Sequence, residues 1–226
     1  MENQRDIVQE VLERFYHHQI LQHMVLVGSW CIPLYRDYYF AHPNISPLRT
    51  RDIDFLLPRK FKNIHKVDVP ALVEDLGFLI EFNYPDGLMR LVHPDLIIEF
   101  LVPQIGKGTD GPFPIADLSM NAQPLRAVAP LLDHTVSIDI GRISVKLPHP
   151  IIYGFQKLIS SKDRHQKDKR NRDTSVALEI LHICSREEPI DKLIKSFRAF
   201  TEKQQKVILR LLQQFGADEI LRNLEN

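Results

Sequence analysis

The sequence predicts an α+β protein in which a mixed sheet flanked by helices is followed by an all-helical domain. Between residues 23 and 147, short apolar runs are separated by Gly, Pro, Asn and Asp, a pattern typical of strands joined by turns. From residue 151 onward, the apolar residues follow only a helical period. The two patterns meet at "PHP", residues 148–150. We therefore expect a first domain over residues 1–147 and a helical domain over residues 148–226.

The composition is that of an ordinary globular protein without an overall electrostatic field. The chain has 226 residues, of which 44% are hydrophobic, and 29 basic residues balance 29 acidic ones. A net charge of zero provides no general attraction for nucleic acid or an anionic membrane, so any basic site must be local. The start of the chain lacks the features of a signal peptide, and the apolar run at 96–102 is too short to span a bilayer. We expect a cytoplasmic protein that does not associate with membranes.

The cysteines and histidines provide no metal site or disulfide framework. Cys31 and Cys184 lie far apart in the sequence, and the ten histidines follow no metal-ligand spacing. We expect both thiols to be reduced and buried.

The first half of the chain is expected to alternate between helices and strands. Apolar residues recur at helical spacing near the start, and Pro, Asn and Ser gather around residue 43. In chain order the expected elements are a helix over 5–22, a strand over 23–30, a helix over 29–37, a loop over 38–48 and a strand over 52–57.

The second half of the first domain is expected to contain most of the strands. "YPDGL" at 84–88 and "HPD" at 93–95 are turn signals between apolar runs. We expect a helix over 69–76, strands over 78–84, 88–93 and 96–102, a loop over 103–114 and a hairpin over 134–147. The helical domain is expected to contain helices over 151–163, 167–184, 189–199, 202–215 and 217–224.

Three acidic residues stand at strand positions and suggest a metal site. Asp52 and Asp54 are two residues apart, so in a strand they project from the same face and repel one another. A shared divalent cation removes that repulsion, and Mg²⁺ prefers carboxylates together with substrate phosphates. Glu99 lies within the apolar run "LIIEFLV", where an ionised side chain needs a partner or a metal. Taken singly, each feature is also typical of solvent-facing residues.

The dipeptide Gly28-Ser29 follows an apolar strand and precedes an expected helix. Backbone N–H groups at such a turn can bind an anion, glycine permits close approach, and the serine hydroxyl can donate to a phosphate oxygen. The alternative is an ordinary helix N-cap. Trp30, the next residue, fits either a core position or a platform that stacks on a base.

Together, Gly28-Ser29, Asp52-Ile53-Asp54 and Glu99 resemble the signature of the polymerase-β-type nucleotidyltransferase superfamily. The form "GSW…LRTRDIDFLLP" is similar to bacterial nucleotidyltransferase-like proteins, and the likeness covers residues 20–102. The resemblance implies that Asp52, Asp54 and Glu99 hold two Mg²⁺ ions, of which one activates the attacking hydroxyl and the other binds the triphosphate. The 23 residues from Ser29 to Asp52 exceed the compact family pattern, and the expected loop at 38–48 accounts for the excess.

A basic segment, "KLISSKDRHQKDKRNR" at residues 157–172, begins in the first helix of the helical domain. It carries seven Lys or Arg and two Asp, a local charge of 7 − 2 = +5, which is also compatible with a solvated helical surface. Lys157 and Arg164 lie on the side of the helix opposite its apolar stripe, and an ion pair between Lys169 and Asp173 is geometrically possible. The resemblance implies that Lys157, Arg164 and Lys169 face the triphosphate across a cleft, with Arg49 and Arg51 close to the acids.

The sequence therefore predicts an Mg²⁺-dependent nucleotidyltransferase. It would move a nucleoside monophosphate from an NTP to an acceptor, which could be a small molecule, a tRNA or a protein. Two alternatives remain: a nucleotide-binding or regulatory module without catalysis, and the toxin of a toxin–antitoxin pair. The sequence does not indicate the acceptor, the preferred base or the oligomeric state.

Overall fold

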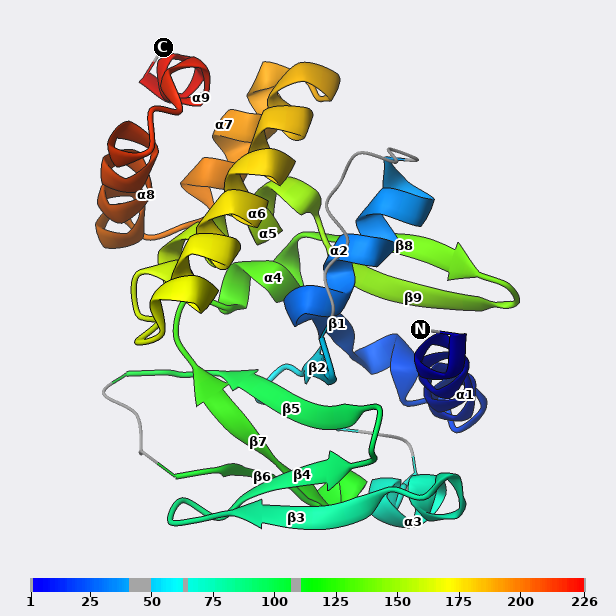
Figure 1. Cartoon of the computed structure of the whole chain (residues 1–226). Coiled ribbons are helices and arrows are strands. Elements are labelled where there is room, and N and C mark those ends of the chain that lie inside the picture. Colours follow the sequence, from blue (N-terminus) through cyan, green and yellow to red (C-terminus); the bar gives the residue numbers. More distant parts are fainter. Residues whose placement is uncertain (1, 41–49, 63–64, 107–110, 226) are drawn as a thin grey trace. The chain divides into compact units, whose positions relative to one another are not determined.

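The computed structural model describes residues 2–40, 50–62, 65–106 and 111–225, and it confirms the mixed α/β class with C-terminal helices (Figure 1). By its internal contacts the chain divides into two compact units. The sheet unit comprises the described residues up to 126 and residues 135–147. The helical unit comprises residues 127–134 and 148–225.

The sheet unit is built around a seven-stranded mixed sheet. Five strands follow the order β1 (Val25–Val27), β2 (Asp52–Leu56), β5 (Ile97–Pro103), β4 (Leu88–Val92), β3 (Leu79–Asn83). β2 and β5 run parallel, and the other neighbours in this series are antiparallel. β7 (Met120–Leu125) runs parallel to the end of β5 and pairs with β6 (Phe113–Ile115). β8 (Thr135–Ile140) and β9 (Ile143–Pro148) form the expected hairpin as a separate two-stranded sheet.

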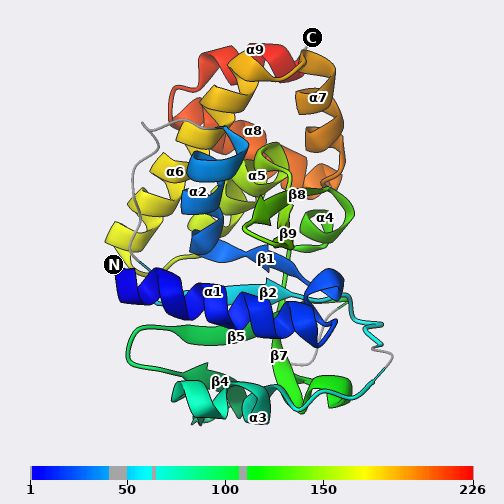
Figure 2. The same cartoon turned by 90° about the vertical axis from the view of Figure 1, so that its right-hand side faces the viewer.

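Helix α1 (Glu2–His17) lies along one face of this sheet (Figure 2). Phe15 contacts the rings of Phe55 on β2 and Phe100 on β5, with centroids 5.2 and 6.4 Å apart. The sequence extended this helix to residue 22, which is wrong at its C-terminal end. Gln19 adopts a left-handed conformation, and the Ile20 amide donates to the Phe15 carbonyl, a bonding pattern that terminates helices. A 3₁₀ turn, η1 (Leu21–His23), then leads into β1.

The other helices of the sheet unit follow the sequence prediction closely. Gly28 to Tyr39 form one helical stretch made of η2 (Gly28–Trp30), α2 (Cys31–Leu34) and η3 (Tyr35–Tyr39). The loop expected over 38–48 therefore starts later, and residues 41–48 of it lie outside the described residues. α3 (Val69–Val73) and η4 (Glu74–Leu76) are capped by Asp68 at the start and end at Gly77.

The region after β5 contains structure that the sequence analysis did not predict. The loop expected over 103–114 ends at β6, and β7 and the 3₁₀ turn η5 (Ala116–Leu118) follow. Pro114 and Pro124 lie within these strands and cannot donate to a sheet ladder, so the sequence pattern reads as a loop.

The helical unit contains all five helices that the sequence predicts, together with a short additional helix, α4 (Ala129–Asp133). The five are α5 (Pro150–Ser161), α6 (Lys167–Glu187), α7 (Ile190–Arg198), α8 (Glu202–Gln214) and α9 (Asp218–Glu225). α5 and α6 are in close contact at Gly154, where an added Cβ would lie 2.7 Å from Cγ of Leu181. Phe155 extends the core toward α7 through Phe197.

Cys31 and Cys184 are both buried, as predicted, and within the described residues neither forms a disulfide. Among the helices in the described part of the chain, none combines the length and the apolar character needed to cross a membrane.

We predict that Gly154→Val lowers the free energy of unfolding by about 1–3 kcal/mol, because the new side chain overpacks the contact with Leu181. Urea unfolding followed by far-ultraviolet circular dichroism measures this change. Ser175→Val, at an exposed position of α6, is the matched control and should shift stability by no more than about 0.5 kcal/mol. Equal effects of the two substitutions would contradict the tight α5–α6 contact.

Candidate active site

The Gly28-Ser29 turn lies directly beside the second aspartate. β1 and β2 pair so that Val27 is opposite Asp54, which brings the following residue, Gly28, to this carboxylate. Gly28 has a φ of 70°, and a Cβ built on it would lie 1.9 Å from Oδ2 of Asp54. Only glycine therefore permits this approach, because any side chain would occupy the position of the carboxylate oxygen. Trp30 is buried, as its core interpretation predicts.

The three acids project from one face of two adjacent strands. In the parallel pairing of β2 with β5, Asp54 is opposite Glu99 and Asp52 is opposite Ile97. Directly opposed residues of neighbouring strands lie about 4.8 Å apart and share a face. Phe55 and Phe100 take the opposite face, where α1 covers them. The sheet thus separates an apolar face from an acidic one.

Glu99 has a cationic partner that the sequence analysis did not identify. Nε of Arg90, on β4, lies 2.7 Å from Oε1 of Glu99. Burial raises the pKa of Glu99, whose side chain is 15% exposed; the charge of Arg90 lowers this pKa, and that of Asp52 raises it. Arg90 therefore helps to keep Glu99 ionised in a partly buried position.

The acidic face has the chemistry of a divalent-cation site, but its side chains are not gathered into one. Carboxylate oxygens from two adjacent strands are the ligands that Mg²⁺ prefers, and Gly28 leaves room for the Asp54 carboxylate at the strand end. Over the described ranges, no three His, Cys, Asp or Glu side chains are grouped to hold a metal ion. Glu99 is instead held by Arg90, so a bound cation would have to compete with this guanidinium.

The basic residues near the acids are described only in part. Arg49 lies outside the described residues. Arg51 is exposed, and its Nη2 donates to the carbonyl of His93, 3.0 Å away, which ties the start of β2 to the β4–β5 turn. Thr50 Oγ1 accepts a hydrogen bond from the Asp52 amide.

The cations predicted in the helical unit share one buried carboxylate. Asp173, on α6, is 5% exposed and lies 3.0 Å from both Lys157 Nζ and Arg164 Nε. Two cations and one anion give this cluster a net charge of 2 − 1 = +1. The suggested pair between Lys169 and Asp173 does not form, because Asp173 binds Lys157 and Arg164 instead, and Lys169 is exposed.

The two cations of this cluster differ in accessibility. Lys157 is buried, with its ammonium 5.6 Å from the ring centroid of Tyr153. The side chain of Arg164 is half exposed. Arg164 can therefore reach a solvent-borne anion without the desolvation and side-chain movement that Lys157 would require.

Comparison with known proteins adds a family and a fold. Residues 6–201 match a family model described as nucleotidyltransferase. An antigenic nucleotidyltransferase-like protein from Paracoccidioides brasiliensis has a similar structure, with a TM-score of 0.54 and 12% identity over 98% of this chain and 93% of that one.

A second solved structure aligns with this chain with a lower TM-score. ANT(2")-Ia in complex with adenylyl-2"-tobramycin aligns with a TM-score of 0.48 and 12% identity, over 94% of this chain and 99% of that one. No curated protein matches the sequence.

We predict that Gly28→Ala lowers the free energy of unfolding more than Gly87→Ala does. Both glycines have a positive φ, so alanine costs about 1–2 kcal/mol of backbone strain at either position. Gly87 has no atom within 4 Å of an added Cβ, whereas Gly28 has Asp54, and overpacking adds about 1–3 kcal/mol. Denaturant unfolding of the two variants measures the difference. Indistinguishable losses would contradict the contact between Gly28 and Asp54.

We predict opposite pKa shifts of Glu99 when its two charged neighbours are removed. Arg90→Met should raise the pKa of Glu99, since the cation that favours the carboxylate is lost; Asp52→Asn should lower it, since a repelling anion is lost. Carboxyl-carbon NMR of labelled glutamate measures both titrations. In Arg90→Met, Glu99 should therefore become protonated at a higher pH during acidification. Shifts of the same sign would contradict the arrangement of the three side chains.

Proposed function

The chain belongs to the nucleotidyltransferase family, and from this premise we propose that it transfers a nucleoside monophosphate from an NTP to an acceptor with the help of Mg²⁺. The observation that carries the proposal is the register of β2 and β5, which puts Asp52, Asp54 and Glu99 on one face, with Gly28 against Asp54. Acids on one face beside an anion-binding turn are what phosphoryl transfer with metal ions needs.

In this proposal, Asp52, Asp54 and Glu99 are the residues that would hold the metal ions. Bound Mg²⁺ supplies charge neutralisation at the triphosphate and lowers the pKa of the acceptor hydroxyl. The N–H groups and hydroxyl of the Gly28-Ser29 turn bind phosphate oxygens. Arg90 lies against Oε1 of Glu99, so a cation held by Glu99 would share its carboxylate with this guanidinium.

The reaction forms one bond and breaks one. The acceptor oxygen attacks the α-phosphorus, and the bond from this phosphorus to the bridging oxygen of the β-phosphate breaks. Pyrophosphate leaves with the electron pair. The hydroxyl proton of the acceptor passes to solvent or to a carboxylate of the acidic face as the new bond forms.

The cationic residues have a supporting role in this proposal. Arg49 and Arg51 precede the acids in sequence, and Lys157, Arg164 and Lys169 supply positive charge for the triphosphate and the leaving pyrophosphate. The net charge of +1 on the Lys157–Asp173–Arg164 cluster and the exposure of Arg164 support this role.

One observation favours a second candidate, a module that binds nucleotide without transferring it. Glu99 is paired with Arg90 in the structure. If this pair persists with nucleotide bound, Asp52 and Asp54 alone could anchor a metal–nucleotide complex without completing a catalytic pair of ions.

We predict that Mg²⁺ and α-labelled NTPs give label transfer to an acceptor, and that Asp54→Asn reduces the rate by roughly 100-fold or more, a typical loss when one group that stabilises transition-state charge is removed. Chromatography of the labelled products, with cell metabolites, tRNA and protein supplied as separate acceptor pools, measures transfer. Asp139→Asn, at an exposed strand position of the same unit, is the control and should retain the full rate.

The outcomes separate the candidate functions. Nucleotide binding without transfer in any pool contradicts the enzyme and supports the module. Label on tRNA or protein identifies a macromolecular acceptor, as the toxin interpretation requires, and label on a metabolite identifies a small-molecule enzyme.

A further inference from the structure

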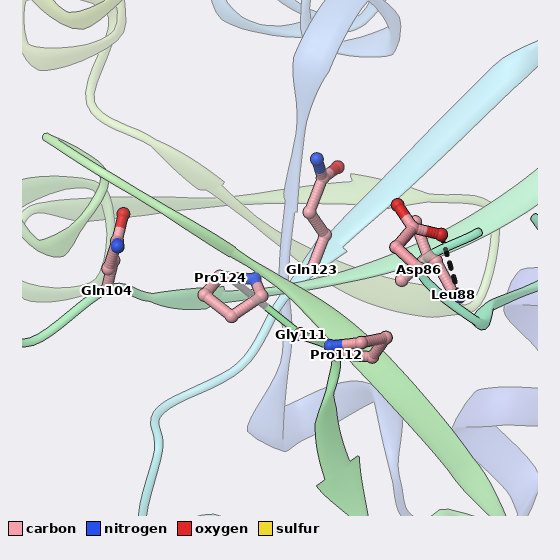
Figure 3. A pocket seen from close by; sticks show the side chains of 7 residues that line it. All are labelled: Asp86, Leu88, Gln104, Gly111, Pro112, Gln123 and Pro124. Atoms are coloured by element: carbon pink, nitrogen blue, oxygen red, sulfur yellow. Dashed lines mark hydrogen bonds between the residues drawn. The ribbon is translucent and has the colours of Figure 1, made fainter. Parts of the chain in front are cut away.

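A small polar pocket opens on the sheet unit where the β3–β4 turn meets β7. It has a volume of about 140 Å³, and its walls include the side chains of Asp86, Gln104 and Gln123 (Figure 3). Leu88, Pro112 and Pro124 supply the apolar part of the lining. In Figure 3 the amides of Gln104 and Gln123 and the carboxylate of Asp86 rise to the same side, above the two proline rings.

The pocket borders the acidic face of the sheet through Gln123. Gln123 is opposite Leu101, so both share the face of Glu99, two residues earlier on β5. Strand spacing places the Cα atoms of Gln123 and Glu99 roughly 8 Å apart. On the other side of the pocket, Leu88 is two residues before Arg90, the partner of Glu99. A molecule with a single ring can therefore touch the pocket and reach the third acid.

The sheet order places the pocket and the Gly28-Ser29 turn on opposite sides of the acids. The turn follows β1, at the β1 side of β2, whereas Gln123 lies on β7, beyond β5. In-line displacement at phosphorus requires the attacking oxygen and the leaving pyrophosphate to be on opposite sides. If the turn binds phosphate, the pocket is on the side from which the acceptor attacks.

The lining chemistry selects against phosphate and for hydroxyl groups. Among the described residues that line the pocket, Asp86 is the one charged group, and the Arg126 guanidinium beside Gln104 balances its charge, so the pocket has no net positive charge to favour an anion. Arg126 Nε donates to Oε1 of Gln104, which leaves the NH₂ group of Gln104 as a donor. A carboxylate and two amides offer donors and acceptors at once, the combination that neighbouring hydroxyls satisfy.

The pocket is held in shape by hydrogen bonds behind its lining. Asn121 on β7 accepts from the Met89 amide at 2.8 Å and donates to the Gly87 carbonyl at 3.0 Å, which fixes the turn against β7. Asp86 accepts from the Leu88 amide at 3.2 Å. The polar groups are therefore positioned by strands and a turn before any ligand arrives.

We propose that this pocket binds the acceptor, and that the acceptor is a small uncharged polyol such as a sugar or cyclitol. The role of the polyol as acceptor rests on the proposed nucleotidyl transfer, whereas its binding to the pocket does not. The hydroxyl-rich body of the acceptor contacts Asp86, Gln104 and Gln123, and one hydroxyl extends toward Glu99. The volume limits the bound part to about one ring, because complete pockets for drug-sized ligands span roughly 300–1,000 Å³.

NMR of the glutamine side-chain amides tests the binding directly. The probes are myo-inositol and glucose, titrated without nucleotide into the Asp54→Asn protein, with Mg²⁺–ATP titrated separately. The signals of Gln104 and Gln123 should shift with a polyol and remain in place with ATP. Gln123→Ala should weaken the polyol affinity by about 2- to 10-fold, the effect of one neutral hydrogen bond.

The control is Gln213→Ala, which removes an exposed glutamine from α8 and should leave the affinity unchanged. The inference is overturned if neither polyol shifts the signals of Gln104 and Gln123. It is also overturned if ATP shifts them. Label transfer by the wild-type protein distinguishes the two proposals. Transfer together with unmoved glutamine signals overturns only the acceptor pocket, and polyol binding without any transfer overturns only the enzyme.

Discussion

The parallel pairing of β2 with β5 is the constraint on which the candidate site depends. One register brings Phe55 beside Phe100 on the face that α1 covers and Asp54 beside Glu99 on the other face. A slip by a single residue would turn the acids into the core and the aromatic rings outward, at a large desolvation cost. The packing of Phe15 on the sheet therefore also fixes the positions of the carboxylates.

The same geometry creates an electrostatic problem that the neighbouring strand solves. Burial raises the pKa of Glu99, and repulsion by the Asp52 carboxylate on the same face also raises it. Arg90 on β4 offsets both effects from 2.7 Å. In the helical unit, Asp173 does the reverse, holding two cations with one carboxylate. Each unit thus joins an acid to a cation, and the sheet unit keeps an excess of negative charge at its site.

The sequence was sufficient to predict the elements whose patterns are local. Turn signals and periodicity located β3, β4, β5 and the long helices after residue 148 within a few residues, and strand alternation put Asp52 and Asp54 on one face. β6 and β7 were missed because Pro114 and Pro124 contradict a strand pattern and only tertiary pairing sustains them. α1 ends early because Gln19 turns left-handed, which the sequence does not signal. The pairing of Arg90 with Glu99 could have been predicted from the sequence. A tight turn at 94–95 pairs His93 with Leu96, and counting back along the hairpin puts Arg90 opposite Glu99.

The contact between Gly28 and Asp54 bears on how related sequences should be interpreted. Acidic doublets in strands are common, but the position of this carboxylate requires a residue with no Cβ on the preceding antiparallel strand end. A homologue that retains both aspartates and carries a larger residue in place of the glycine must move the second acid or the chain that faces it. The glycine is consequently a second criterion, beside the two aspartates, for deciding whether a related chain can hold its carboxylates in this arrangement.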